Sequence, residues 1–130
     1  MTLNDPLANV LSAIMNAERR GKKEIVTKNS SRLIRTVLDL MKASGYIEGY
    51  EVTQDAKGDL LAVRLAGRIN GVGVIKPRHQ VGKDGLERFE KRFLPAKDFG
   101  IIIVSTNQGL MTHMAAKELG IGGTLISYCY

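Results

Sequence analysis

An unbroken run of β-branched residues, Ile101-Ile102-Ile103-Val104, is the feature that most constrains how this chain can fold. β-branched side chains favour extended backbone, and a strand without alternating polar residues is typical of one buried on both faces. Residues 100–105 are therefore predicted to form a buried strand. The chain has 130 residues, which gives room for one compact domain or two very small ones around such strands.

Helical and extended patterns alternate in the first half of the chain. Asp5-Pro6 pairs an N-cap acceptor with the helical position that tolerates proline, and apolar residues recur at helical spacing up to Gly21. A second helix is predicted between possible caps at 29–31 and a left-handed stop at Gly45. The extended segments are a strand at 24–28 and a hairpin of 46–54 and 60–66. This α-β-α-β-β order predicts a helix pair laid against a small sheet.

The second half is predicted to be mostly strands with short helices. Thr112 can cap a short helix that runs to Leu119. The other predicted elements are a glycine-interrupted strand at 68–75, a helix at 85–94 and a last strand at 124–130. The boundary is predicted at residues 66–70, which gives an N-terminal subdomain of 1–67 and a C-terminal one of 68–130. The fold class is α+β.

Basic residues gather in two parts of the chain. There are 19 lysines and arginines against 13 acids, a net charge of +6, and the isoelectric point is about 9.6. Most of this excess lies in residues 19–35 and 60–83, and the rest of the chain is neutral or acidic. Either block could be an ordinary solvated surface. Together they favour a polyphosphate partner, because each neutralised phosphate releases condensed counterions.

Several classes of protein are not expected from the composition. Apolar residues make up 44%, which argues against a disordered chain. No apolar run approaches the roughly 20 residues of a membrane span, and no secretory signal is recognised, so a cytoplasmic protein is expected. Cys129, His79 and His113 form a poor zinc ligand set, and we expect neither a metal nor a cofactor.

Catalytic residues are not evident either. His113 could act as a base for the hydroxyls of Ser105 or Thr106, but no carboxylate is placed to orient it, so a half-exposed helical residue is expected. Glu90 lies in a helix with interleaved acids and bases, which predicts a solvated face. A small phosphate-handling enzyme that uses the turn Gly120–Gly123 is the alternative function, although the turn lacks nucleotide-binding spacing. Nonspecific DNA binding is a third possibility, but the second helix mixes Asp39 with its arginines.

The segment Ser105-Thr106-Asn107-Gln108-Gly109 follows the buried strand and carries hydroxyls, amides and no charge. It could be a connection capped by its own side chains. It could also be a polar loop that hydrogen-bonds bases, sugars and 2′-hydroxyls of RNA, with affinity supplied by basic residues elsewhere. The residues alone leave both interpretations open.

Three motifs together resemble one known family, that of the eighth protein of the small ribosomal subunit. They are Ser105-Thr106-x-x-Gly109-x-Met111-Thr112, the glycines Gly120-Ile121-Gly122-Gly123 and the opening Asp5-Pro6-Leu7-Ala8. The likeness covers essentially the whole chain. Lys76-Pro77-Arg78 and Leu94-Pro95 are similar to the archaeal and eukaryotic branch of that family.

The resemblance implies two small α/β subdomains in tight contact and a primary rRNA-binding protein without enzymatic activity. Its partners would be an irregular stem in the central domain of small-subunit rRNA and neighbouring ribosomal proteins, with a monomer acting in assembly within the ribosome. Where many relatives have serine this chain has Asn107, and His79 lies near the position of an aromatic stacking residue in bacterial relatives. The expected RNA-binding residues are Ser105, Thr106, Asn107, Gln108, Gly109, Gly122, Lys28, Arg32, Lys76 and Arg78.

Overall fold

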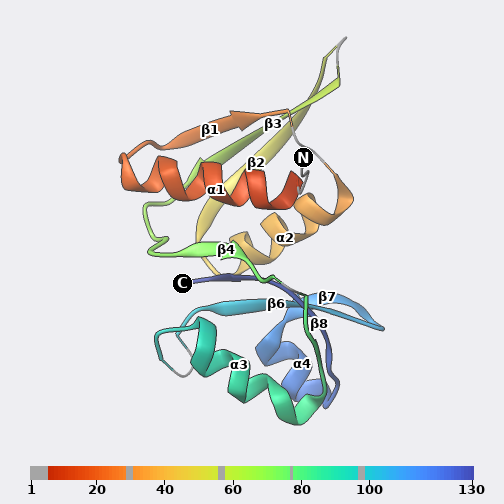
Figure 1. The fold of residues 1–130 in the computed structure, drawn as a ribbon. Helices are drawn as coiled ribbons and strands as arrows, with labels where there is room; N and C mark the ends of the chain where they lie inside the picture. Colours follow the sequence, from red (N-terminus) through yellow and green to blue (C-terminus); the bar gives the residue numbers. More distant parts are fainter. Residues whose placement is uncertain (1–5, 29–30, 56–57, 77, 97–98) are drawn as a thin grey trace. The chain divides into compact units, whose positions relative to one another are not determined.

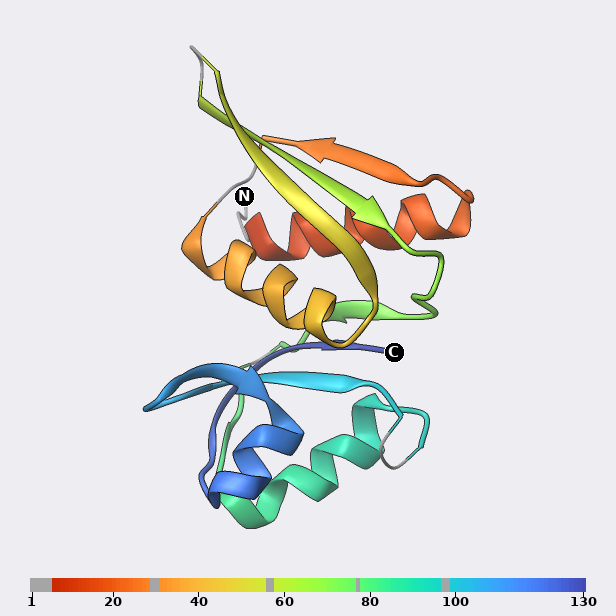
Figure 2. The same cartoon turned by 180° about the vertical axis from the view of Figure 1, so that it is seen from behind.

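The computed structural model describes residues 6–28, 31–55, 58–76, 78–96 and 99–130. The chain forms two compact units, Met1–Val72 and Gly73–Tyr130. Each unit holds an antiparallel sheet with a pair of α-helices on one face (Figures 1 and 2), which confirms the α+β class. Among the described residues, no helix has the length and apolar character needed to cross a bilayer.

The first unit has the predicted α-β-α-β-β order. Its elements are α1 (Pro6–Arg19), β1 (Glu24–Thr27), α2 (Arg32–Ala43), β2 (Ile47–Asp55) and β3 (Gly58–Leu65). The sheet order is β1-β3-β2, so β1 and β2 are both edge strands. Both helices lie on the same face of this sheet in the two opposite views (Figures 1 and 2).

Local signals in the sequence account for these two helices. The hydroxyl of Ser31 accepts a hydrogen bond from the amide of Ile34 at 3.2 Å, which caps α2. Gly45 follows α2 with φ +85°, the left-handed stop that the sequence predicted. Asp5, the expected cap of α1, lies outside the described residues. The apolar stripes of both helices are buried: Leu7, Val10, Leu11, Ile14 and Ala17 from α1, with Ile34, Val37, Leu38 and Met41 from α2.

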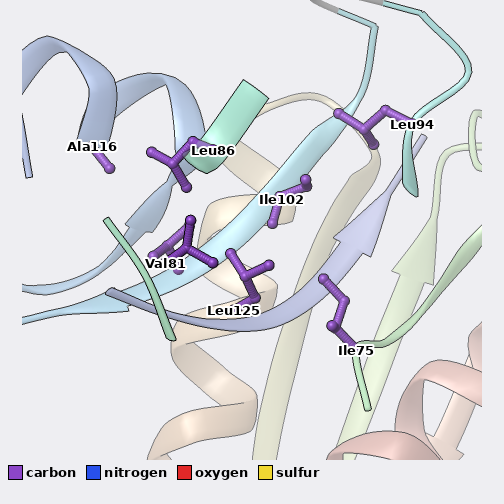
Figure 3. Close-up of a cluster of buried hydrophobic side chains, with 8 residues drawn as sticks. Ile75, Val81, Leu86, Leu94, Ile102, Ala116 and Leu125 are labelled. Atoms are coloured by element: carbon purple, nitrogen blue, oxygen red, sulfur yellow. The ribbon is translucent and has the colours of Figure 1, made fainter. Parts of the chain in front are cut away.

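The second unit is built around one sheet in the order β4-β8-β6-β7, with β5 also paired to β8. Its elements are β4 (Val72–Val74), β5 (Gln80–Val81), α3 (Leu86–Phe93), β6 (Ile101–Thr106), β7 (Gly109–Thr112), α4 (His113–Leu119) and β8 (Gly123–Cys129). Strand β6 is central and its first four residues are buried, as their β-branched run predicted. Ile102 and Leu125 of the sheet belong to one buried cluster with Leu86 of α3 and Ala116 of α4 (Figure 3).

The boundary between the units lies after Val72 and not within the predicted residues 66–70. Ile69 explains the difference. Its side chain is buried, and its amide donates to Oε2 of Glu18 at 3.2 Å, so this part of the chain stays with the first unit. The predicted strand at 68–75 is accordingly shorter, and only Val72–Val74 are extended.

Strand β7 ends opposite Ile103, and the next residue, His113, turns into α4. The amide of Ile102 donates to Nδ1 of His113 at 3.0 Å. The β6–β7 ladder ends at the pair Ile103–Thr112, so the next amide of β6 has no carbonyl of β7 to bind. The imidazole of His113 accepts from this amide in place of such a carbonyl. His113 is fully buried, so the expectation of a half-exposed residue is wrong.

Glu90 is also buried, contrary to the predicted solvated face. Only 4% of it is exposed, and Oε1 accepts from Nζ of Lys117, which links α3 to α4. Its other oxygen lies 3.7 Å from Nε2 of His113. Because Nδ1 accepts a hydrogen bond, the proton of the neutral imidazole must be on Nε2, facing this carboxylate. The three side chains connect both helices to the central strand.

Protonation of His113 should destabilise the protein. Burial lowers the pKa of His113 below its ordinary value of 6.5, and the nearby Glu90 carboxylate only partly opposes this. The unfolded chain then takes up the proton first as the pH falls. The stability from neutral His113 is complete above pH 6.5 and falls below it, by up to about 1.4 kcal/mol per pH unit. We expect urea unfolding to give a lower free energy at pH 5.5 than at 7.5.

His113→Asn supplies the control for this prediction. Its side-chain oxygen can still accept from the amide of Ile102 but does not titrate. The variant should be less stable at pH 7.5 and should lose less stability between pH 7.5 and 5.5. An undiminished pH dependence in the variant would assign the effect to other groups.

Candidate nucleic-acid interface

The expected polar loop at 105–109 is a tight β-hairpin. Ser105 and Thr106 are the last residues of β6, and Thr106 pairs with Gly109 at the start of β7. Only Asn107 and Gln108 form the turn. A loop prediction was therefore wrong for most of this segment, because a two-residue connection leaves its flanking residues in the ladder.

The hydroxyl of Thr106 is used within this turn. It donates to the carbonyl of Gly109 at 2.7 Å and accepts from the amide of Gln108 at 3.1 Å. One lone pair of the oxygen remains, so this hydroxyl can only accept from a ligand. The alternative that the segment is capped by its own side chains thus holds for Thr106. Asn107 and Gln108 have exposed side chains.

Gly109 has φ +112°, a conformation that side-chain-bearing residues rarely adopt. An added Cβ at this position would have nothing within 4 Å. The turn itself therefore requires glycine, and the open space beside it leaves the backbone accessible to a ligand.

A shallow groove of about 440 Å³ lies beside the hairpin. Its walls come from three strand ends, because β8 pairs with β6 on one edge and with β5 on the other. In register, Thr124 of β8 lies opposite both Ser105 and Gln80. Hydroxyl and amide groups therefore line a surface without charged side chains. The lining residues are Gln80, Val81, Gly82, Ser105, Asn107, Gly123 and Thr124.

Gly122 and Gly123 allow neighbouring backbone of the same unit to lie directly against the start of β8. A Cβ at Gly122 would lie 2.1 Å from the carbonyl oxygen of Val81, and one at Gly123 would lie 2.2 Å from that of Ser105. Neither distance is compatible with a side chain. Gly122 lets β5 and β8 meet, and so builds the groove indirectly; a contact of Gly122 itself with RNA stays a prediction.

The basic residues Lys76 and Arg78 lie between β4 and β5, on the connection that leads into the groove wall, and both are exposed. Pro77 between them lies outside the described residues. The ring of His79 is 5.0 Å, centroid to centroid, from Phe89 of α3. This half-buried ring already packs against the protein, and a stacking contact of His79 with RNA stays a prediction.

Lys28 and Arg32 belong to the first unit, whereas the hairpin and groove belong to the second. Lys28 follows β1 and Arg32 begins α2, and both side chains are exposed. The second basic block of the sequence is itself divided, because Arg64 and Arg68 belong to the first unit and Lys76 and Arg78 to the second. The expected site residues are therefore divided between the two units.

The turn Gly120–Gly123 is poorly suited to hold a phosphate. It follows the C-terminus of α4, where the helix dipole disfavours an anion. Gly120 is the left-handed cap of that helix, with φ +69°, and the next two glycines of the turn contact backbone of the protein. No cluster of metal-ligating side chains is found among the described residues. The geometry thus gives no support to the alternative enzyme.

Sequence reasoning missed Gln80, Gly82 and Thr124, which line the groove. Gln80 and Gly82 lie within the second basic block, and Thr124 directly follows Gly122-Gly123, so these sequence features indicate the region but not the individual residues. The strand register pairs Thr124 with both Ser105 and Gln80, and Gly82 lines the same groove. Such pairing joins residues that are distant along the chain, so local motifs do not show it.

The second unit thus has a polar, uncharged hairpin and groove, and exposed basic side chains precede the strand β5 that forms one wall. In RNA-binding proteins, polar groups of this kind contact base edges and sugars, and basic side chains that bind phosphates supply affinity. A comparison with protein-family models agrees with this geometry, since the model described as "Ribosomal protein S8" matches residues 5–130. The match includes both units and all the candidate site residues. The chain therefore belongs to the ribosomal protein S8 family, the RNA-binding proteins of the small ribosomal subunit.

Proposed function

We propose that this protein binds an irregular stem in the central domain of small-subunit rRNA and supports the assembly of that domain, as a monomer in cytoplasmic ribosomes. The observation that carries the proposal is the groove in which Gln80, Ser105 and Thr124 present polar groups from three different strands. Regular A-form RNA hides its base edges in a deep major groove. An uncharged polar groove of this kind is suited to the accessible base edges of an opened or irregular stem.

We assign a role to each site residue according to its exposure and its place in the fold. Asn107 and Gln108 would contact bases and sugars directly, because their side chains are exposed at the turn. Ser105 and Thr106 would contribute single hydroxyl contacts, and Gly109 would let the RNA backbone approach. The four basic residues Lys28, Arg32, Lys76 and Arg78 would meet phosphates. We also assign the chain to the archaeal and eukaryotic branch, on the basis of Lys76-Pro77-Arg78 and Leu94-Pro95.

Footprinting of the purified protein on small-subunit rRNA tests the partner. Protection confined to one irregular stem of the central domain is expected. Protection of regular duplex throughout the rRNA, or of another domain, would contradict the proposal. An RNA fragment with the protected stem, and a fully paired version of it, then serve as cognate and noncognate ligands for the variants of the site residues.

Asn107→Ala should separate specificity from affinity. The side chain is exposed, so its removal should leave the melting temperature unchanged. If the amide pairs with RNA in a desolvated contact, cognate affinity should fall by about 1–3 kcal/mol, or roughly 5- to 150-fold. Noncognate affinity and the salt dependence should stay the same. Equal losses on both RNAs would show that the hairpin does not read the stem.

Thr106 offers a matched pair of variants for the same hairpin. Thr106→Ser keeps the hydroxyl and its two bonds within the turn, whereas Thr106→Val keeps the shape and loses them. We expect Thr106→Val to lower the melting temperature and the cognate affinity, and Thr106→Ser to change both less. If the two variants bind alike, the hydroxyl of Thr106 is not needed at the interface.

The basic residues should act on all RNAs alike. With roughly 4–6 phosphate contacts, the slope of log affinity against log salt should be about −3 to −5. Replacing Lys76 and Arg78 together by alanine should weaken cognate and noncognate binding by similar factors. It should also make the slope less negative by about 0.7–0.9 for each phosphate that is no longer neutralised. A slope near zero in the parent protein would contradict the phosphate contacts.

A further inference from the structure

Among the described strands of the first unit, β1 pairs with β3 on one side, and none pairs with its outer edge. The amide of Leu65 donates to the carbonyl of Lys23, which makes these two residues a hydrogen-bonded pair. Bonded and non-bonded pairs alternate along an antiparallel ladder. In the register of β1 and β3, Glu24 and Val26 therefore fall at non-bonded positions. Their N–H and C=O groups point away from β3, toward the free edge.

A groove of about 370 Å³ runs between this edge and α1. Helix α1 lies beside β1 in both views of the ribbon (Figures 1 and 2). One part of the groove is apolar, formed by Ala13 and Ala17 of the helix and Ile25 of the strand. Val26 also lines it, and 61% of this side chain is exposed, a large value for valine. Three charged residues line the groove as well, the basic Arg20 and Lys22 and the acidic Glu24, so its lining is positive by one charge.

We propose that this edge and groove bind an extended, acidic peptide segment of another protein as an additional strand of the first unit's sheet. Strand addition uses backbone groups for affinity and alternate side chains for selectivity. The outward groups of Glu24 and Val26 supply the backbone partners. Successive side chains of a strand point to opposite faces, so apolar side chains of the segment would contact Ile25 and the alanines on the helix side. Its carboxylates would project from the other face, beside Val26, where Lys22 lies within reach, and Arg20 adds positive charge to the groove.

Charge decides among the possible occupants. If a second copy of the protein paired through its own β1, its Lys22, Lys23 and Lys28 would lie near the same three lysines of the first copy. Repulsion between like charges at a sheet edge disfavours such self-pairing. An RNA strand could meet the two basic side chains that line the groove. It would not use the alternating donors and acceptors of the edge or the exposed valine. An acidic peptide uses all of these features.

The test uses the full-length protein labelled with 15N and a capped Val-Glu-Val-Glu-Val-Glu peptide, with a Val-Lys-Val-Lys-Val-Lys peptide as the control. Addition of the acidic peptide is expected to shift the amide signals of residues 22–27 and to slow the exchange of the Glu24 and Val26 amides. The basic peptide should do neither. Unshifted amides at millimolar acidic peptide would overturn the proposal.

Val26→Pro is the decisive variant. Proline removes the outward N–H of Val26 but no bond of the β1–β3 ladder, and an edge strand tolerates it. The affinity for the acidic peptide should fall about tenfold or more. Val26→Thr keeps the amide and the branched shape and should bind more tightly than Val26→Pro. Equal affinities of Val26→Pro and the parent protein would exclude strand addition.

Two charge variants complete the test. Arg20→Glu and Arg19→Glu change the net charge equally, but only Arg20 lines the groove. Arg20→Glu should weaken acidic-peptide binding strongly and Arg19→Glu only slightly. If the rRNA fragment shifts the Val26 amide and the peptide does not, the groove is an RNA contact and the proposal fails. Neither result changes the predicted footprint of the hairpin in the second unit.

Discussion

Strand β6 is hydrogen-bonded to β7 along one edge and to β8 along the other, and the rest of the second unit depends on this double pairing. Its first four residues are buried, so neither face of the strand is exposed over this stretch. Polar groups can appear only where the strand leaves the core, at Ser105 and Thr106. The same strand that makes the unit stable therefore determines where it can meet an RNA.

The groove at this end of β6 is a product of backbone proximity. Gly122 and Gly123 carry no side chain, so β5 and β6 can approach the start of β8 closely enough for Gln80, Ser105 and Thr124 to share one surface. A substitution at either glycine would move the walls of the site without touching a residue that binds. The glycines that identify the family in the sequence are thus structural in their immediate effect.

Much of the fold could be predicted from local patterns, since a helix stripe, a cap and a β-branched run are properties of neighbouring residues. The order of the first unit, the caps at Ser31 and Gly45 and the buried central strand were all predictable in this way. Strand β7 was missed because its polar beginning resembles a loop. Glu90 was placed in solvent because its partner, Lys117, is 27 residues away along the chain. Which residues line the groove depends on the strand register, and the register cannot be deduced from local sequence patterns.

The bond between Ile102 and His113 gives the central strand two kinds of protected amide. In most of β6 an amide is released to solvent only when neighbouring strands separate. The amide of Ile102 is instead held by a side chain at the start of α4, so it is released when the helix moves off the sheet. Adjacent positions of one strand can therefore exchange with solvent through different opening motions. Ile102 reports on the helix, while its neighbours report on the sheet that carries the hairpin at 105–109.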